Sequence, residues 1–256
     1  MTARDRVTPL VLTWNEEPNI GRALDSLRWA KRVVVLDSGS TDRTEDIARA
    51  FPNVSWHVHP FDGFRLQTLR GVREAATAGE FVLALDADMQ VPPTFLDELE
   101  ENFLTGDFVG GRVGFAYRYG SRSLWGSVYP AQVRLFRPER LRVTQRGHGH
   151  KFAVDGPVYR FAARLVHDDR KPFRRWLDTQ ARYSLDEVRA LRRGDPARLR
   201  DLLRRGGFMP LLAFASGYLT AGGPLAGRAA LRYAYERAVF EALLALRLLR
   251  GEEEVR

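Results

Sequence analysis

Short apolar segments alternate with segments of helical periodicity along the first 90 residues of the chain. The apolar segments cover residues 7–13, 33–36, 54–58 and 81–85. Continuous apolar runs of this length are typical of strands that are buried on both faces. The helical segment before the last of them is expected to face the sheet with Leu66, Leu69, Val72 and Ala76. This alternation predicts the α/β class, with a mostly parallel sheet flanked by helices.

Acids and hydroxyls follow three of the predicted strands. They lie in the segments 14–17, 37–42 and 86–88. Ligands of such sheets bind beyond the carboxyl ends of the strands, so these segments are expected to meet at one binding edge. Each has a simpler alternative: Asp37 and Ser38 suit a turn or a helix cap, and Glu16 and Glu17 suit the first turn of a helix. Three coincidences at one edge favour a ligand site.

Asp86 and Asp88 end the apolar run 81–85 and are separated by one small residue. Strand side chains alternate with period 2, so both carboxylates are expected to leave the strand on the same side. Mg²⁺ and Mn²⁺ take carboxylate oxygens, and Mg²⁺ commonly combines one or two carboxylates with substrate phosphates. The pair therefore predicts metal-assisted chemistry on a diphosphate, with a capped turn as the alternative.

These motifs together resemble family 2 glycosyltransferases. The resemblance rests on the segments 13–17 (Thr-Trp-Asn-Glu-Glu), 35–42 (Val-Leu-Asp-Ser-Gly-Ser-Thr-Asp) and 85–88 (Leu-Asp-Ala-Asp), in this order and spacing. It is closest to the bacterial lipopolysaccharide-core-type glucosyltransferases. It implies the GT-A fold, a Rossmann-like and mostly parallel sheet flanked by helices, with a C-terminal helical extension. The expected division is a nucleotide-sugar-binding and catalytic domain over residues 1–170 and a helical, membrane-associating region over residues 171–256.

The resemblance also implies the residues that bind the donor. By position, the nucleotide-sugar-binding residues are Thr13, Glu16, Asp37, Ser38, Gln67 and Asp86. Asp37 would hold the uracil ring, Asp86 would line the ribose, and Asp88 is the likelier metal ligand of the pair Asp88 and Asp86, for Mg²⁺ or Mn²⁺. The subgroup has Lys-Asn after the glutamine, whereas this chain has Thr68 and Leu69, which leaves the contacts of that helix open.

The activity implied is an inverting transfer of a hexose from a nucleotide diphosphate sugar, a UDP-sugar, to a lipid-linked or cell-envelope glycan. Such a transfer needs a general base. The subgroup carries His-Glu before Val-x-Gly, and alignment on Gly156 puts His150 at the position of that glutamate. A neutral imidazole can act as a base near pH 7. His150 is the first candidate, followed by His148 and Asp155.

The second half of the chain changes in character. Aromatic strand-like pieces from about residue 108 are expected to extend the sheet and build an acceptor pocket, and helical patterns begin near Lys171. Asp168 and Asp169 suit the cap of that helix. Residues 206–227 carry no charge but contain breaking prolines and glycines. They predict an interfacial or re-entrant hairpin on an anionic membrane surface, with a soluble helical pair as the alternative.

Composition sets further limits on function. The net charge is +8, and all but three of the 40 basic residues are arginine, which suits phosphate-bearing substrates or anionic lipid and also a codon bias. The chain contains no cysteine, which excludes disulfides, thiolate metal sites and a cysteine nucleophile. The polar start predicts a cytoplasmic protein, peripheral on the cytoplasmic membrane face.

Two other function classes compete with glycosyl transfer. A sugar nucleotidyltransferase would be expected to hold triphosphate with a glycine-rich basic loop after the first strand, whereas residues 15–17 are acidic and lack glycine. A non-catalytic membrane scaffold remains an alternative. No recognised nucleic-acid-binding motif is visible, so no nucleic acid partner is expected.

Overall fold

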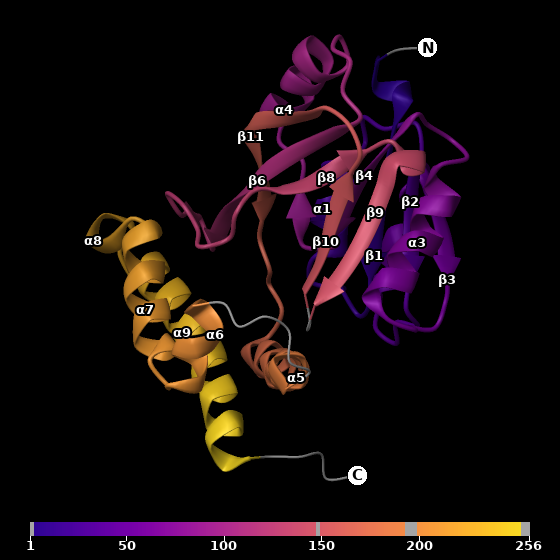
Figure 1. Cartoon of the computed structure of the whole chain (residues 1–256). Coiled ribbons are helices and arrows are strands. Elements are labelled where there is room, and N and C mark those ends of the chain that lie inside the picture. Colours follow the sequence, from indigo (N-terminus) through magenta and orange to yellow (C-terminus); the bar gives the residue numbers. More distant parts are fainter. Residues whose placement is uncertain (1–2, 147–148, 193–198, 252–256) are drawn as a thin grey trace. The chain divides into compact units, whose positions relative to one another are not determined.

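The computed structural model describes residues 3–146, 149–192 and 199–251. The strand order of the main sheet is β3-β2-β1-β4-β8-β6-β11-β5, and Figure 1 labels all of these strands except β5. The first four strands in this order are parallel: β1 (Val7–Thr13), β2 (Val33–Asp37), β3 (Val54–Val58) and β4 (Phe81–Asp86). Thr13 pairs with Asp37 and Leu12 with Asp86. The register therefore brings the polar ends of β1, β2 and β4 to one edge, as expected.

The other half of the sheet mixes directions. The strands are β5 (Met89–Gln90), β6 (Gly110–Tyr119), β8 (Gln132–Phe136) and β11 (Val158–His167). β8 runs antiparallel to both β4 and β6, β11 runs parallel to β6, and β5 runs antiparallel to β11. The short β7 (Arg122–Ser123) pairs with β6, while β9 (Leu141–Arg146) and β10 (Gly149–Val154) form a separate ribbon.

Helices cover both faces of the sheet because neighbouring strand residues point to opposite sides. On one face, Val11 and Val35 pack with α1 (Ile20–Asp25), α2 (Thr44–Arg49), α4 (Pro93–Glu98) and the π-helical turn η2 (Leu99–Phe103). On the other face, Leu10 and Val34 pack with α3 (Phe64–Ala75). Single 3-10 turns are η1 (Ala3–Arg6) and η3 (Pro138–Arg140). The predicted mostly parallel sheet flanked by helices is confirmed.

The inward face of α3 differs from the one predicted. Leu66 and Ala76 are exposed, whereas Gln67, Thr68, Gly71, Val72 and Ala75 are buried. The reason is close packing at Gly71, where an added Cβ would lie 2.6 Å from a methyl carbon of Leu10. Helix α3 therefore packs against the sheet along the side that contains Gly71. The polar Gln67 lies one turn earlier on the same side and is buried with it.

The chain divides into two compact units. One comprises residues 1–118, 129–144 and 151–171, and the other comprises residues 119–128, 145–150 and 172–256. The helices of the second unit are α5 (Phe173–Arg192), α6 (Leu199–Arg205), α7 (Met209–Thr220), α8 (Gly223–Ala226) and α9 (Arg228–Arg250). The predicted helical C-terminal extension is confirmed.

Helix α9 is the packing centre of the second unit. Its first half packs along α7, where Gly217 allows close approach to Ala234. Its second half packs against α5, and Glu241 receives buried hydrogen bonds from Arg204 of α6 at 2.9 Å. Within the part of the chain that the structure describes, no helix has the length and apolarity needed to span a membrane.

Candidate functional site

The loops after β1 and β2 are tied together by hydrogen bonds at the carboxyl edge of the sheet. Asn15 adopts a left-handed conformation (φ 53°), and its Oδ1 accepts a hydrogen bond from the Thr41 N–H at 2.6 Å. Ser40 Oγ accepts one from the Asn15 N–H at 2.6 Å, and Thr44 Oγ1 accepts one from the Glu16 N–H at 2.7 Å. These bonds make one preorganised loop surface from segments that lie 25 residues or more apart.

Asp37 lies buried beneath this surface. Its carboxylate accepts hydrogen bonds from the N–H groups of Gly39 and Ser40 at 2.8 and 2.7 Å, and from the Ser40 hydroxyl. This is the turn chemistry that the sequence offered as the alternative to a binding role. Asp37 thus shapes the loop, and each of its oxygens has a partner.

Thr13, Ser38 and Gln67 form a chain of contacts beside Asp37. The Ser38 N–H bonds to the Thr13 carbonyl at 3.0 Å, and Gln67 donates from Nε2 to Ser38 Oγ at 3.1 Å. Among the described residues, Thr13 Oγ1 and Gln67 Oε1 are buried and have no hydrogen-bond partner. Buried polar atoms normally find partners, so two unpaired atoms at one place indicate room for a ligand.

Strand β5 brings a distant segment to Asp88. Met89 and Gln90, directly after the Asp-Ala-Asp sequence, pair with His167 and Val166 at the end of β11. The Asp168 N–H also bonds to the Asp88 carbonyl at 3.0 Å. Residues 167–171 therefore lie beside a motif that is 80 positions earlier in the sequence.

Lys171 stands at the centre of the acidic group assembled there. Its Nζ lies 2.8 Å from Glu16 Oε1, 3.2 Å from Asp169 Oδ1 and 3.6 Å from Asp88 Oδ2. Asn19 completes the group by donating to Glu16 Oε2 at 2.8 Å and to Asp169 Oδ1 at 3.0 Å. The predicted first-turn acid Glu16 is thus part of the same cluster as Asp88.

The charges of the cluster depend on one another. Burial alone would lower the pKa of Lys171, but the charges of Asp88, Glu16 and Asp169 outweigh it and raise that pKa above its ordinary value. Burial raises the pKa of Glu16 despite the opposing charge of Lys171. Burial also acts to raise the pKa of Asp169, yet Lys171 and the hydrogen bonds to the carboxylate bring it below its ordinary value. Lys171 is therefore an ammonium ion throughout the physiological range.

Asp168 faces away from Lys171, toward arginines. It is buried, and its carboxylate receives a hydrogen bond from Arg170 Nη2 at 2.9 Å and lies 3.6 Å from Arg22 Nε. Asp169 accepts a hydrogen bond from the Lys171 N–H at 3.0 Å, just before α5 begins at Phe173. The bond of Asp169 is a local turn ahead of the helix, while Asp168 is an ion-pair residue.

One oxygen of Asp88 is available for a cation. Asp88 Oδ1 is buried without a hydrogen-bond partner, and His167 Nε2 lies 3.6 Å from it. The His167 ring is stacked on the Tyr117 ring, with 4.6 Å between the ring centroids. The Tyr117 ring is in turn stacked on the Tyr129 ring, with 5.7 Å between the centroids. A carboxylate oxygen and an imidazole nitrogen are suitable Mn²⁺ ligands, so these residues fit a divalent cation.

The described residues contain no ready-made group of three or more acidic, histidine or cysteine side chains that could hold a metal.

Asp86 contacts a different side chain from those that Asp88 contacts. Its Oδ2 lies 3.4 Å from Nη2 of the buried Arg134, which also lies over the rings of Phe115 and Phe152. Strand β4 ends at Asp86 and the chain turns at residues 87–88, so Asp88 lies in the turn and not in the strand. Asp86 has an arginine partner, whereas Asp88 contacts the lysine and the histidine.

The structure separates the predicted base candidates. Asp155 precedes the start of β11, whereas the Asp88 cluster lies at the end of that strand, about 30 Å away for ten residues. Asp155 is exposed there and bonds to Arg142 at 3.1 Å, so it is not retained as a base candidate. His148 lies outside the described residues, and for His150 the structure describes only the backbone, in β10.

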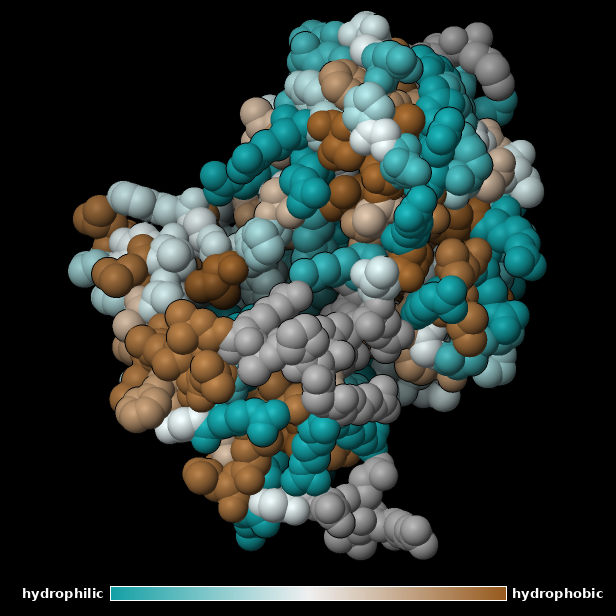
Figure 2. Space-filling model, in the orientation of Figure 1, coloured by the Kyte–Doolittle hydropathy of each residue, from teal (hydrophilic) through white to brown (hydrophobic). Residues whose placement is uncertain are grey.

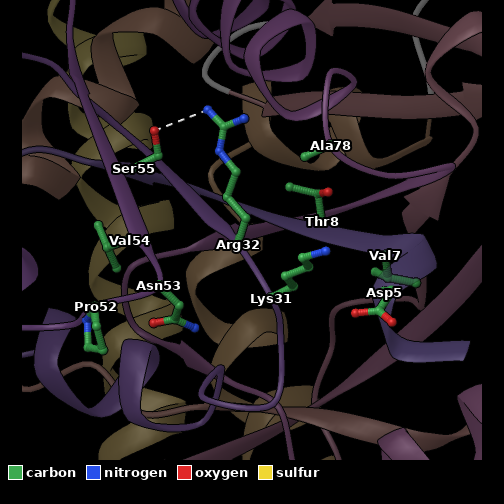
Figure 3. Close-up of a pocket in the computed structure, with 10 residues that line it drawn as sticks. All are labelled: Asp5, Val7, Thr8, Lys31, Arg32, Pro52, Asn53, Val54, Ser55 and Ala78. Carbon is green, nitrogen blue, oxygen red and sulfur yellow. Dashed lines mark hydrogen bonds between the residues drawn. The ribbon is translucent and has the colours of Figure 1, made fainter. Parts of the chain in front are cut away.

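A hollow of about 460 Å³ lies at the opposite edge of the sheet, at the amino ends of β1, β2 and β3 (Figure 3). Lys31 and Arg32 line it, but Arg32 is already bonded to the hydroxyls of Ser55 and Thr77, both at 3.1 Å. It is remote from every motif at the carboxyl edge and is not the donor site.

Sequence reasoning missed Asn19, Arg134, His167 and Lys171. Three of them follow long intervals without a recognisable motif, and only the pairing of the two-residue β5 with β11 brings His167 and Lys171 into place. A usable signal existed for Lys171, because it is one of only three lysines in an arginine-rich chain and it directly follows two acids.

Two curated glycosyltransferases are similar to this chain in sequence. Lipopolysaccharide core biosynthesis glycosyltransferase LpsC of Rhizobium meliloti is 26% identical over 151 residues, which are 56% of this chain and 52% of that protein. Dolichol-phosphate mannosyltransferase of Pyrococcus furiosus is 27% identical over 128 residues, which are 46% of this chain and 35% of that protein. The chain thus spans between a third and about half of the length of the curated relatives it matches.

Two solved structures have a similar fold. TarS of S. aureus, in complex with UDP-GlcNAc, gives a TM-score of 0.51 at 13% identity, over 98% of this chain and 93% of that chain. Glucosyl-3-phosphoglycerate synthase of Mycobacterium tuberculosis, in complex with Mn²⁺, UDP and phosphoglyceric acid, gives 0.50 at 22% identity, over 75% and 80%. These similarities confirm the predicted GT-A fold.

The match to a protein-family model shows which family the chain belongs to. The model described as glycosyl transferase family 2 matches residues 10–163, which is more than half of the chain and includes the loops after β1, β2 and β4. The chain therefore belongs to glycosyl transferase family 2, as its motifs predicted.

Proposed function

We propose that this glycosyltransferase transfers a hexose from a UDP-sugar that binds at the carboxyl edge of β1, β2 and β4, with a divalent cation at Asp88. The observation that carries the proposal is the set of buried polar atoms without partners at this edge: Thr13 Oγ1, Gln67 Oε1 and Asp88 Oδ1. The similar structures of TarS and glucosyl-3-phosphoglycerate synthase were solved with UDP-GlcNAc and with UDP and Mn²⁺, respectively.

Within this proposal the residues divide into two groups. Thr13, Ser38 and Gln67 contact the nucleoside, on a loop surface that Asp37 holds in shape. Asp86 lines the ribose, where Arg134 balances its charge. With the nucleoside and the ribose placed in this way, the diphosphate lies next to Asp88, beside Lys171 and the proposed divalent cation.

The diphosphate end of the site consists of Glu16, Asp88, His167 and Lys171. Asp88 and His167 would hold the cation, Mg²⁺ or Mn²⁺. A divalent cation bound there neutralises negative charge that develops on the leaving diphosphate. Glu16 keeps Lys171 oriented through their 2.8 Å ion pair. The set of charges is therefore suited to a nucleoside diphosphate leaving group.

The transfer is proposed to invert the anomeric centre. An acceptor hydroxyl attacks the anomeric carbon as the bond to the diphosphate oxygen breaks, and a base takes the hydroxyl proton. His150 is proposed as this base. Asp169 is poorly suited, because Lys171 and its hydrogen bonds lower its pKa. Replacement of His150 by glutamine is expected to lower kcat by about a hundredfold or more, because the acceptor hydroxyl loses its base, and an unchanged kcat would refute this role.

The proposed acceptor is a lipid-linked or cell-envelope glycan. The relative LpsC is named for lipopolysaccharide core biosynthesis, and the mannosyltransferase from Pyrococcus furiosus is named for dolichol phosphate. Tyr129, stacked on Tyr117, is partly exposed, and an exposed aromatic ring is a common surface for the apolar face of a sugar. A sugar acceptor attached to lipid would also explain an apolar surface elsewhere in the chain.

Helix α7 carries such a surface. It is apolar over most of its length, yet Gly217 is its only buried residue among those described. Leu211 and Leu219 are 76% and 73% exposed, and Figure 2 shows hydrophobic residues gathered over α7. Exposed apolar patches of this kind mark protein or membrane contacts. We propose that α7 lies on the cytoplasmic face of an anionic membrane, with the exposed Arg228 near lipid headgroups.

Donor turnover tests the catalytic part. Purified protein would be screened for hydrolysis of UDP-glucose, UDP-galactose and UDP-GlcNAc with Mn²⁺ or Mg²⁺, beside Asp88→Asn. Cation-dependent release of UDP that falls at least a hundredfold in Asp88→Asn is expected. Equal turnover in the variant would refute the metal assignment. Release that is identical with and without cation would refute metal dependence.

Vesicle flotation tests the membrane part. The substitution Leu219→Glu is expected to reduce binding to phosphatidylglycerol vesicles severalfold, because a charge replaces an apolar contact with lipid. Leu249→Glu is the matched control, since Leu249 is 74% exposed but lies in the half of α9 that packs against α5 rather than α7. Equal loss in both variants, or no binding by the unaltered chain, would contradict the role of α7.

A further inference from the structure

The ammonium of Lys171 occupies part of the space in which a cation is proposed to bind. Three carboxylates surround it, and its side chain is only 13% exposed. The two oxygens of Asp88 are divided: Oδ2 faces Lys171 at 3.6 Å, while Oδ1 faces His167 at 3.6 Å and lacks a hydrogen bond. The Asp88 carboxylate thus contacts the Lys171 ammonium with one oxygen and has its other oxygen available to a metal ion.

A lysine and a divalent cation on the same carboxylate oppose each other. Like charges a few ångströms apart in a largely buried site repel strongly, so a metal at Asp88 is weakened while Lys171 stays in place. Lys171 can leave because its charge sits on a flexible four-carbon stem. A diphosphate beside the cluster would offer it a group whose total negative charge is larger than that of one carboxylate.

The neighbours of Lys171 are arranged so that its departure leaves few groups unpaired. Glu16 Oε2 and Asp169 Oδ1 both keep hydrogen bonds from Asn19, and Asp169 Oδ1 also accepts the backbone N–H of Lys171. Glu16 Oε1, Asp88 Oδ2 and Asp169 Oδ1 would lose their ion pair with the Lys171 side chain, but Asp169 Oδ1 would keep its two other donors. Asn19 and the Lys171 N–H therefore still hold Glu16 and Asp169 when the ammonium leaves.

We propose that Lys171 is an internal counter-ion that holds the metal position at Asp88 closed in the donor-free protein and transfers to the diphosphate when the donor binds. This inference rests on the proposed function. Its consequence is ordered binding, in which the protein has low affinity for the free cation and high affinity for the cation together with the nucleotide. Lys171 then contributes a second positive charge to the leaving group.

The test measures Mn²⁺ binding directly, by the electron paramagnetic resonance signal of free Mn²⁺, without nucleotide. Lys171→Met is expected to bind Mn²⁺ at least tenfold more tightly than the unaltered chain, which corresponds to about 1.4 kcal/mol. Lys31→Met, at the opposite sheet edge, is the matched control and is expected to bind as the unaltered chain does. Equal or weaker binding by Lys171→Met would overturn the proposal.

Addition of UDP supplies the second readout. UDP should strengthen Mn²⁺ binding by the unaltered chain more than by Lys171→Met, because only the former has an ammonium to transfer; an equal gain would count against the proposal. If Lys171→Met is unfolded without metal, Mn²⁺ is expected to restore its near-ultraviolet circular dichroism, and failure to do so would overturn the proposal.

A further substitution separates this proposal from the function on which it rests. Asp88→Asn in the Lys171→Met background should abolish Mn²⁺ binding. Binding that survives would refute the metal site as well as the role of Lys171. Binding that depends on Asp88 but is equal with and without Lys171 would refute only the counter-ion.

Discussion

Replacing Asn19 by alanine is expected to destabilise the protein and to weaken donor binding together. Asn19 stands at the amino end of α1, where an asparagine usually caps the helix, yet its side chain makes no capping bond. It is 1% exposed and instead donates to Glu16 and Asp169, while its Oδ1 accepts hydrogen bonds from the Arg170 N–H and from Arg22, both at 2.9 Å. It therefore connects the loop after β1 to residues 168–171.

The size of the effect follows from these bonds. Three of the four join Asn19 to a charged group, and hydrogen bonds to charged groups are worth about 1.5–3 kcal/mol each. Their effects overlap, and water can enter the space left by the amide, so a total loss of about 3–4 kcal/mol is expected. For a chain of this size this corresponds to a decrease in Tm of roughly 10 °C.

Urea unfolding and thermal melts measure the loss, with Asn102→Ala as the control. The Asn102 side chain is exposed and makes no hydrogen bond among the described residues, so its replacement should change stability by less than about 0.5 kcal/mol. Calorimetric titration with UDP and Mn²⁺ should show weaker binding by Asn19→Ala. A loss of stability below about 1 kcal/mol would refute the assigned role of Asn19.

Three further predictions test other parts of the structure. Hydrogen bonding from Arg6 lowers the pKa of Glu80 against the effect of burial. This ion pair therefore stabilises the fold above pH 4.5, and its contribution fades as the pH falls. Glu80→Gln should lower Tm by a few degrees at pH 7, and the difference in Tm between the variant and the unaltered chain should narrow toward pH 4 in thermal melts. Gly71→Ala places a Cβ against Leu10 and should cost about 1–3 kcal/mol in urea unfolding, whereas a stabilised variant would show that the contact is not tight. Tyr117→Leu removes the ring that holds His167 and should weaken Mn²⁺ binding in the presence of UDP by roughly threefold to tenfold, and unchanged affinity would exclude this positioning role.

The parallel half of the fold is predictable from the sequence because three of its strands, β1, β2 and β4, are buried on both faces. β1 and β3 begin and end at the predicted residues, and β2 and β4 extend one residue beyond the prediction. Asp37 and Asp86 fall at the strand ends for the same reason. A continuous apolar run and the polar residue that ends it are local signals, so no long-range information is needed to place them.

The rest of the site depends on long-range pairing. The two-residue β5 has too little sequence to be recognised, yet it brings His167 and Lys171 to Asp88. The inward face of α3 was predicted from leucines, but the close contact at Gly71 turns Gln67 inward instead. Asn19 is recognisable as a helix-capping residue, whereas its actual contacts come from residues 150 positions later. Such roles follow from tertiary contacts that no local pattern records.

The central claim is that a cation and a nucleoside diphosphate bind together at Asp88. Anomalous scattering from crystals soaked with Mn²⁺ and UDP tests it most directly. We predict one Mn²⁺ peak within coordination distance of Asp88 Oδ1 and His167 Nε2, with the diphosphate on its open side and Lys171 Nζ moved from Asp88 to a phosphate oxygen. Bound UDP without a Mn²⁺ peak at Asp88, or Mn²⁺ bound at Asp86 instead, would contradict the account.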